Sequence, residues 1–252
     1  MIQQNTIHLG DCLEVLRAMP DGCVDLFVQD PPYGVTQNDW DTAPELAPLW
    51  AEWLRVGKEN AAFVFTATMP FGCDLIHSQR KLFRYDLVWS KVIATGFLNA
   101  NRMPLRAHEN VLVFYRKLPT YNPQMGTGEA YNKRTGAATA NYGAYSANQV
   151  ENTGTRHPKS VFQIAYEDEF FDATAKGQTI HPTQKPIDLY RYLIRTYSNV
   201  GDLVFDGFGG SGTCAVAAHA EKRRFVVVEK SPEYHAKAVE RLRDYQRQLT
   251  LF

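Results

Sequence analysis

Four consecutive residues, Asp30-Pro31-Pro32-Tyr33, combine the groups needed to bind a flat molecule through an amino substituent. The two prolines fix φ and lack backbone donors, so the turn is stiff and presents mainly carbonyl acceptors. The Asp30 carboxylate adds another acceptor, and Tyr33 adds an aromatic face. Such a cluster suits an N–H₂ group on a nucleobase edge. A proline turn that only closes the apolar strand 24–29 explains the same residues, and the turn alone does not decide between the two.

A second candidate site is the stretch 207–212, which matches G-x-G-x-x-G between an apolar strand and a small-residue helix. Glu229 follows Gly209 by twenty residues. Glycines let a ligand approach the backbone, and a carboxylate at the next strand end can accept hydrogen bonds from both ribose hydroxyls. The stretch therefore predicts a site for an adenosine-containing cofactor, and a glycine turn beside an incidental acid is the weaker alternative.

The elements around both sites alternate between strand and helix. The expected strands are 6–9, 24–29, 61–65, 85–89, 111–115, 203–205 and 225–228, and the expected helices are 12–19, 44–56, 71–82, 186–197, 214–220 and 232–248. This order predicts an α/β fold with a mostly parallel twisted sheet and helices on both faces. Because only about forty residues follow the glycine loop, the N-terminal strands must complete the sheet, which brings Asp30 near that loop. The arrangement favours group transfer over hydride transfer.

The composition indicates a globular protein of 252 residues with 44% hydrophobic residues and zero formal net charge. No stretch approaches the ~18 apolar residues of a membrane span, and the N-terminus shows no secretion signal. The four cysteines lack C-x-x-C spacing, which argues against a metal site and suits reduced thiols in a cytoplasm. Charge is uneven: 80–134 contains ten basic residues and three acids, whereas 30–59 contains two and six. A neutral molecule can therefore present a basic face to a nucleic acid.

The stretch 118–179 has no periodicity and intersperses tyrosines with Gly, Asn, Thr, Lys and Arg. Its tyrosines are Tyr121, Tyr131, Tyr142, Tyr145 and Tyr166. A structureless loop of this length is improbable in a compact domain, and aromatic residues among basic ones suit base stacking, at ~1–3 kcal/mol per base. We expect an inserted recognition element between catalytic parts 1–117 and 180–252, although a surface insertion without a role explains the same composition.

The order of these motifs resembles that of the beta-class amino-methyltransferases of DNA, which use S-adenosylmethionine. In that family a D-P-P-Y motif comes first, a target-recognition region second and an F-x-G-x-G cofactor loop last. The segments 10–12, 89–91, 106–109 and 181–186 also resemble family segments, so the likeness covers nearly the whole chain outside the recognition region. One departure is Gly207, where the family often has proline. The resemblance implies the Rossmann-like S-adenosylmethionine-dependent methyltransferase fold in a circularly permuted motif order.

The resemblance also implies the roles of the D-P-P-Y motif. Asp30 and the Pro31 carbonyl would accept hydrogen bonds from the target amino group, and Tyr33 would stack on a base flipped out of the duplex, with Pro32 completing the motif. An exocyclic amine is a poor nucleophile, and these acceptors stabilise the positive charge that develops on it. The aspartate at the head of the motif favours N6 of adenine in DNA, with N4 of cytosine as the alternative.

Other activities fit the motifs less well. A methyltransferase acting on RNA or on a protein amide is disfavoured by the permuted order and by the tyrosine-rich insertion. A dehydrogenase-like nucleotide binder is disfavoured by the C-terminal position of the glycine loop. A DNA-binding protein without activity is disfavoured because both motifs are intact. We expect a cytoplasmic enzyme of a bacterium or phage, in the class found in restriction–modification, with DNA as partner; a homodimer is left open.

The resemblance assigns the cofactor site to a larger group of residues. Asp11 would bond the adenine, although an N-cap of the helix at Cys12 explains it as well. Glu229 would bond the ribose, and 209–213 would surround the methionine moiety with Thr183 and Lys185. The full implied set is Asp11, Cys12, Thr183, Lys185, Asp206, Phe208, Gly209, Gly210, Ser211, Gly212, Thr213 and Glu229. Trp89, Lys91 and Arg106 are candidates for DNA contacts, with core packing or surface charge as the alternative for each.

Overall fold

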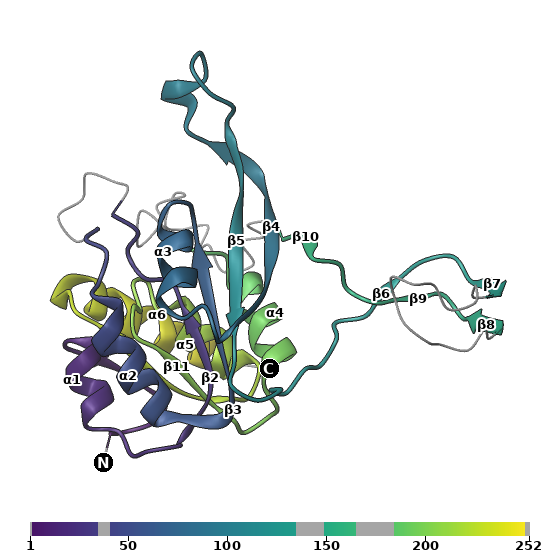
Figure 1. Ribbon diagram of the computed structural model, residues 1–252. Helices are drawn as coiled ribbons and strands as arrows, with labels where there is room; N and C mark the ends of the chain where they lie inside the picture. Colours follow the sequence, from purple (N-terminus) through teal and green to yellow (C-terminus); the bar gives the residue numbers. More distant parts are fainter. Residues whose placement is uncertain (1, 35–40, 135–148, 165–183, 250–252) are drawn as a thin grey trace. The chain divides into compact units, whose positions relative to one another are not determined.

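The computed structural model describes residues 2–34, 41–134, 149–164 and 184–249 (Figure 1). The chain divides into two compact units. The larger contains Met1–Asn122 and Ser160–Phe252, and the smaller contains Pro123–Lys159. Each is described by itself below.

The larger unit is built on one sheet of eight strands in the order β1-β12-β11-β2-β3-β5-β4-β10. Its strands are β1 (Thr6–Leu9), β2 (Val24–Gln29), β3 (Gly57–Ala67), β4 (Phe83–Thr95), β5 (Arg106–Phe114), β10 (Val161–Gln163), β11 (Leu203–Asp206) and β12 (Arg224–Glu229). All neighbouring pairs from β1 to β3 are parallel, whereas β5 is antiparallel to both β3 and β4. The predicted mostly parallel sheet is confirmed, and β2 lies directly beside β11 as the short C-terminal segment requires.

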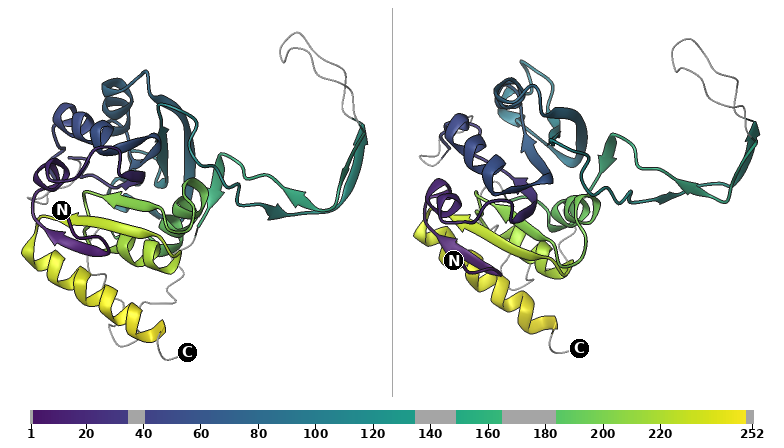
Figure 2. Two further views of the ribbon diagram at one scale, coloured as in Figure 1. Left: turned by 90° about the horizontal axis from the view of Figure 1, so that it is seen from below. Right: turned by 60° about the horizontal axis from the view of Figure 1, so that its bottom comes forward.

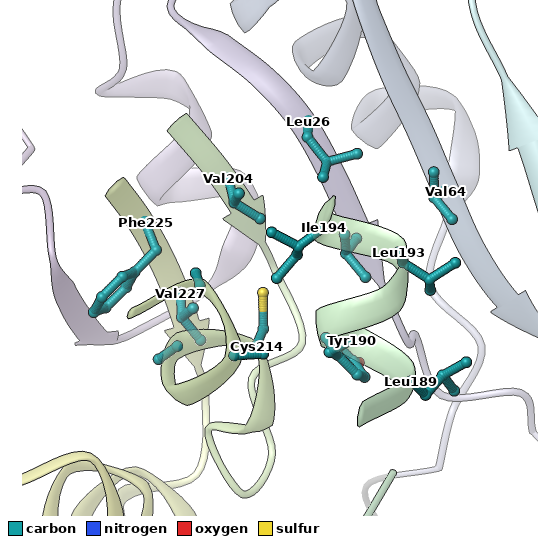
Figure 3. Close-up of a cluster of buried hydrophobic side chains, with 14 of the residues drawn as sticks. Leu26, Val64, Leu189, Tyr190, Leu193, Ile194, Val204, Cys214, Phe225 and Val227 are labelled. Carbon is teal, nitrogen blue, oxygen red and sulfur yellow. The ribbon is translucent and has the colours of Figure 1, made fainter. Parts of the chain in front are cut away.

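Helices cover both faces of this sheet (Figure 1). They are α1 (Cys12–Arg17), α2 (Leu46–Val56), α3 (Phe71–Ser78), α4 (Ile187–Tyr197), α5 (Thr213–Ala220) and α6 (Pro232–Leu249), with a 3-10 turn η1 (Phe97–Asn99). In Figure 3, Leu26 from β2 and Val204 from β11 lie against Ile194 of α4 and Cys214 of α5. The next residue of β2, Phe27, points to the other face and stacks on Phe63 with ring centroids 4.6 Å apart. Burial on both faces explains why these strands read as continuous apolar runs.

β4 and β5 are longer than the expected strands 85–89 and 111–115. Figure 1 shows that their joined ends project beyond the rest of the sheet, with η1 near the tip. The side chains there are largely exposed, including Phe97 and Leu98 at 76% and 84%. These projecting ends, called the β4–β5 arm below, have no buried face, so apolar and polar residues do not alternate along them. Periodicity therefore finds only the part of each strand that lies in the sheet.

The smaller unit consists of two short antiparallel ladders that continue into one another as a narrow ribbon (Figure 2). β6 (Gly126–Thr127) pairs with β9 (Thr155–Arg156), and β7 (Tyr131–Arg134) pairs with β8 (Gln149–Asn152). The Arg156 guanidinium donates to Asn152 Oδ1 at 2.6 Å and lies 4.9 Å from the centre of the Tyr131 ring. With strands of two to four residues, the ribbon is too short to show a period in the sequence.

The smaller unit is shorter than the expected insertion at 118–179. The segment up to Asn122 belongs to the larger unit, where the Asn122 amide donates to the Arg195 carbonyl at 3.1 Å. Val161–Gln163 also belongs to it, because β10 pairs with β4. The predicted Tyr142, Tyr145 and Tyr166 lie outside the described residues. In the described part of the chain no helix is both long and apolar enough to cross a membrane.

Candidate active site

A cavity of about 1080 Å³ opens at the carboxyl ends of the parallel strands. The turn 30–33 after β2 and the glycine loop after β11 both line it. They meet because β2 and β11 are neighbours, with Phe27 opposite Phe205. Chain order reverses at this point of the sheet, where ligands of open α/β folds bind. The two motifs that the sequence singles out therefore face one cavity.

Most of the predicted site residues line this cavity. The predicted cofactor residues found there are Asp11, Cys12, Lys185, Phe208, Gly209, Gly210, Ser211, Thr213 and Glu229. Asp206 and Gly212 do not line it, and Thr183 lies outside the described residues. Lys91 of β4 and Arg106 of β5 also line it, but Trp89 does not.

Trp89 is corrected from a DNA contact to a core residue. Its side chain is 0% exposed, and its indole N–H donates to the Ile164 carbonyl at 3.1 Å. A ring enclosed in this way presents no face to a nucleic acid. Trp89 lies on the same side of β4 as Tyr85 and Leu87, which pack against the same core cluster, so the apolar alternation along 85–89 is the signal that could have indicated its burial.

The carboxylate of Asp30 is held by side chains from three other places in the chain. Oδ1 accepts hydrogen bonds from the Tyr33 hydroxyl at 2.6 Å and from Thr66 Oγ1, on β3, at 2.5 Å. Lys185 Nζ lies 2.9 Å from Oδ1 and 2.8 Å from Oδ2. Burial, followed by the nearby Asp30 charge, raises the pKa of Tyr33 well above its ordinary value, so the hydroxyl stays a neutral donor.

Two further charges extend this arrangement along the cavity wall. Lys185 Nζ lies 3.4 Å from Glu109 Oε2, and Lys91 Nζ pairs with Oε1 of the same carboxylate. The side chains of Lys91, Glu109 and Lys185 are 6–8% exposed. Burial lowers the pKa of Lys185, but the nearby side chains of Asp30, Tyr33 and Glu109 outweigh it and raise that pKa well above its ordinary value. Two ammonium groups and two carboxylates thus form a neutral alternating row, the form in which buried charges are tolerated.

The row changes the interpretation of Lys185. The sequence predicts that Lys185 helps to surround the methionine moiety, but its ammonium group lies on Asp30, and only its carbonyl accepts from Thr213 Oγ1 of the glycine loop, at 3.4 Å. The sequence also gives no role to Glu109 or Thr66. The local signals for Glu109 are its place in the family-like segment 106–109 and its position two residues before the apolar run 111–114.

The glycine loop is pressed against its neighbours through its backbone. Gly207 N donates to Gln29 Oε1 at 3.1 Å, and a Cβ at this position would lie 2.2 Å from Cys12 Sγ. Proline has a Cβ and no N–H, so the residue common in the family does not fit here. Gly209 N donates to the Val228 carbonyl at 2.7 Å, which fixes the loop to β12.

Glu229 at the end of β12 closes the loop from the other side. Its Oε2 accepts from Gly210 N and its Oε1 from Ser231 N, each at 2.7 Å. Each carboxylate oxygen has a second lone pair, so the side chain can still accept two hydroxyl groups from a ligand in the cavity. Asp11 is the N-cap of α1, accepting from Leu13 N at 2.9 Å, and this alternative to a purely ligand-binding role is confirmed.

Two residues support the loop without being exposed in the cavity. Asp206 is 1% exposed, and its Oδ1 accepts from Phe208 N at 2.9 Å. Burial is the main cause that raises its pKa to about 8. Arg241 of α6, which the sequence does not single out, donates to the Ser211 carbonyl at 3.1 Å and to Thr213 Oγ1 at 2.9 Å.

In the described part of the chain no cluster of His, Cys, Asp or Glu side chains could hold a metal ion.

A family model that describes DNA methylases matches residues 24–240, which include both motifs. The chain belongs to this family of DNA methyltransferases. It is 27% identical over 254 residues to the type II methyltransferase M1.MboII of Moraxella bovis, covering 93% of this chain and 95% of that protein. It is 29% identical over 255 residues to the DNA adenine methyltransferase YhdJ of Escherichia coli, covering 95% of this chain and 83% of the relative.

Solved structures show the same fold. The PvuII DNA methyltransferase, described as cytosine-N4-specific, superposes with a TM-score of 0.70 at 19% identity, covering 99% of this chain and 94% of that one. The M1.HpyAVI–SAM complex superposes with a TM-score of 0.61 at 20% identity, covering 94% of this chain and 98% of that one. The methylase thus has the Rossmann-like S-adenosylmethionine-dependent methyltransferase fold, and the resemblance to DNA methyltransferases is confirmed.

Proposed function

We propose that this methylase transfers a methyl group from S-adenosylmethionine to N6 of adenine in DNA, at a short specific sequence and on a base rotated out of the duplex. The observation that carries the proposal is the oriented Asp30 carboxylate. It faces the same cavity as the glycine loop and Glu229, so an amine acceptor and a nucleoside-binding carboxylate share one space.

The catalytic part of the proposal rests on the acceptors around the target amine. Asp30 and the Pro31 carbonyl accept its N–H bonds, which withdraws the lone pair from the ring and offsets the positive charge developing on nitrogen. Tyr33 has two tasks, because its hydroxyl orients Asp30 and its ring lines the cavity where the base would stack. Holding both partners in one orientation supplies much of the remaining acceleration.

The cofactor part rests on the residues at the other end of the cavity. Glu229 retains the lone pairs needed for two ribose hydroxyls, and the cavity has ample volume for a nucleoside beside a base. In this proposal Asp11, which lines the same cavity as Glu229, binds the adenine, and residues 209–213 surround the methionine moiety. When bound, S-adenosylmethionine supplies the methyl group on its sulfonium sulfur.

The choice of adenine rests on the aspartate of the motif and on the names of relatives. Asp30 heads the D-P-P-Y motif, and the Escherichia coli relative is named a DNA adenine methyltransferase. The cytosine-N4-specific PvuII enzyme shares the fold at 19% identity, so it shows the architecture without indicating the base. Transfer to N4 of cytosine is the second candidate, because the same two acceptors serve either exocyclic amine.

Target recognition belongs, in this proposal, to the Pro123–Lys159 ribbon together with Arg106. The ribbon presents the half-exposed Tyr131 ring beside the Arg156 guanidinium, a combination suited to bases and phosphates. Arg106 is exposed at the cavity and can contact a phosphate. The type II relative from Moraxella bovis supports a place in a restriction–modification system.

The decisive experiment identifies the product. Unmethylated plasmid DNA is incubated with the methylase and S-adenosylmethionine, digested to nucleosides and analysed by mass spectrometry, with Asp30→Ala as the negative control. N6-methyl-2′-deoxyadenosine is expected. N4-methyl-2′-deoxycytidine would replace the first candidate with the second, and the absence of either would overturn both. Single-molecule sequencing of the same DNA gives the recognition site.

A further inference from the structure

Lys185 lies between two carboxylates that are not equally satisfied. Its ammonium group is 2.8 Å from Asp30 Oδ2 and 3.4 Å from Glu109 Oε2. Glu109 Oε2 is buried and makes no hydrogen bond to any residue that the structure describes. A buried carboxylate oxygen in this condition is costly, so it calls for an explanation.

The position of Lys185 conflicts with the task of Asp30. Oδ1 of Asp30 already accepts from Tyr33 and Thr66, so Oδ2 is the oxygen left for the target amine. Lys185 Nζ occupies the hydrogen-bonding reach of that oxygen. A protonated amine so close also opposes the positive charge that forms on the target nitrogen, and opposition in a buried site is strong.

We propose that Lys185 is a positioning residue that moves its ammonium group from Asp30 to Glu109 Oε2 when the target amine binds. The inference rests on the proposed function, in which Asp30 accepts the target N–H. A small displacement suffices, because Nζ is already 3.4 Å from the second acceptor. Lysine suits such a movement, since it is a compact charge on a flexible stem with three donors.

Lys91 keeps the Glu109 carboxylate in place, so that Lys185 can move toward a fixed acceptor. Its ammonium group pairs with Oε1 of Glu109 and holds that side chain in place. After the movement Glu109 has a cation on each oxygen, and Asp30 keeps the donors Tyr33 and Thr66 while gaining the target amine. The row remains neutral, and the field at the target becomes more negative when methyl transfer requires it.

A static ion pair and a cofactor ligand are the competing roles for Lys185. In a static role the charge itself matters, so Lys185→Arg preserves function. In a cofactor role, removing the charge weakens binding of S-adenosylmethionine. The proposed movement differs from both, because the planar guanidinium prefers to hold both oxygens of one carboxylate and is expected to remain on Asp30.

The test compares single-turnover methylation by wild type, Glu109→Gln, Lys185→Arg and the double variant, with saturating DNA and S-adenosylmethionine. Glu109→Gln keeps an acceptor for Lys91 but removes the charge that attracts Lys185, so the rate falls roughly 10-fold. Lys185→Arg slows the reaction to a similar extent, and the double variant is no slower than either single variant. The dissociation constant for S-adenosylmethionine and the KM for DNA stay within about 2-fold of wild type.

Matched controls come from a surface ion pair of the same composition. Lys117 Nζ lies 2.7 Å from Glu59 Oε1, with both side chains 66% exposed, and Glu59→Gln should leave the rate unchanged. Melting temperatures confirm that each variant is folded, and Glu109→Gln alone carries the test if Lys185→Arg does not fold. A normal rate in Glu109→Gln, multiplicative losses in the double variant, or weaker cofactor binding in Lys185→Arg would overturn the inference. Failure of wild type to methylate DNA would instead overturn the proposed function.

Discussion

The two ends of the cavity are built in different ways. At the cofactor end the contacts run through backbone amides, with Gly209 N on β12 and Gly210 N on the Glu229 carboxylate. At the catalytic end the reactive carboxylate is held by side chains, since Asp30 is contacted by those of Tyr33, Thr66 and Lys185. Backbone contacts survive most substitutions, whereas a cluster of side chains is disrupted when a single functional group is removed. The comparison predicts that single substitutions at the catalytic end lower the rate of methyl transfer, while those at the cofactor end weaken binding of S-adenosylmethionine.

Asp30→Ala should produce the largest effect. The variant loses the acceptor that stabilises the developing charge, so we expect the single-turnover rate to fall by at least ~10³-fold. Binding of S-adenosylmethionine, measured by calorimetry, should change by less than about 3-fold, because the backbone contacts of the glycine loop are untouched. A normal methylation rate would contradict the mechanism, and a large loss of cofactor affinity would contradict the separation of the two ends.

The same difference explains what the sequence could predict. Asp30 and Glu229 are recognisable because each lies next to a local signal, a proline turn or a glycine loop at fixed spacing. Glu109 and Thr66 gain their roles only through contacts with residues tens of positions away, which no local pattern reports. The contact between the Lys185 ammonium group and Asp30 could not be foreseen for the same reason, because the two residues are 155 positions apart.

The burial of individual residues in β4 and the extent of the irregular strands were also hard to predict from the sequence. The strands and helices of the larger unit follow from apolar runs, so a mostly parallel sheet with β2 near the glycine loop could be predicted, whereas the full strand order of the sheet could not. Trp89 and Lys91 are two residues apart on one strand, yet one is a core residue and the other belongs to the charge row. The β4–β5 arm has no buried face, and the ribbon at 123–159 has strands too short for any period.

Glu229→Ala tests the cofactor end. Removal of the carboxylate deletes both ribose acceptors and leaves the amides of Gly210 and Ser231 without their partner. Two hydrogen bonds to a charged group are lost at about 1.5–3 kcal/mol each, so the dissociation constant for S-adenosylmethionine should rise roughly 10²- to 10⁴-fold. At saturating cofactor the methylation rate should largely recover, and Glu229→Gln should fall between wild type and Glu229→Ala. An unchanged dissociation constant would remove the ribose role.

Thr66→Val sharpens the comparison with a smaller change. The substitution keeps the shape of the side chain and deletes one donor to Asp30 Oδ1, while Tyr33 continues to hold that oxygen. We expect a loss of roughly 5- to 10-fold in rate, since one hydrogen bond to a charged group orients the carboxylate. The matched variant Thr213→Val, at the cofactor end, should instead affect the affinity for S-adenosylmethionine. Equal effects of both variants on rate would show that the two ends are not separable.

Asp206→Asn probes the support of the cofactor end without touching the cavity. Burial raises the pKa of Asp206 to about 8 from its ordinary value of 3.8, so between these values the folded protein keeps a proton that the unfolded chain has released. The unfolding free energy of wild type therefore decreases as pH rises through this window, by roughly 2–3 kcal/mol between pH 6 and pH 8 from this group.

The asparagine does not titrate, and its amide oxygen can still accept from Phe208 N, so the variant should lose less stability over the same interval. Urea unfolding at pH 6, 7 and 8 measures the unfolding free energy of both proteins. The difference between their slopes of unfolding free energy against pH cancels the titration of all other groups. Parallel pH profiles would show that Asp206 is ionised at neutral pH. In that case a buried charged side chain would support the glycine loop, as charged side chains hold Asp30 at the catalytic end. The two ends of the cavity would then differ less than the contacts of the glycine loop suggest.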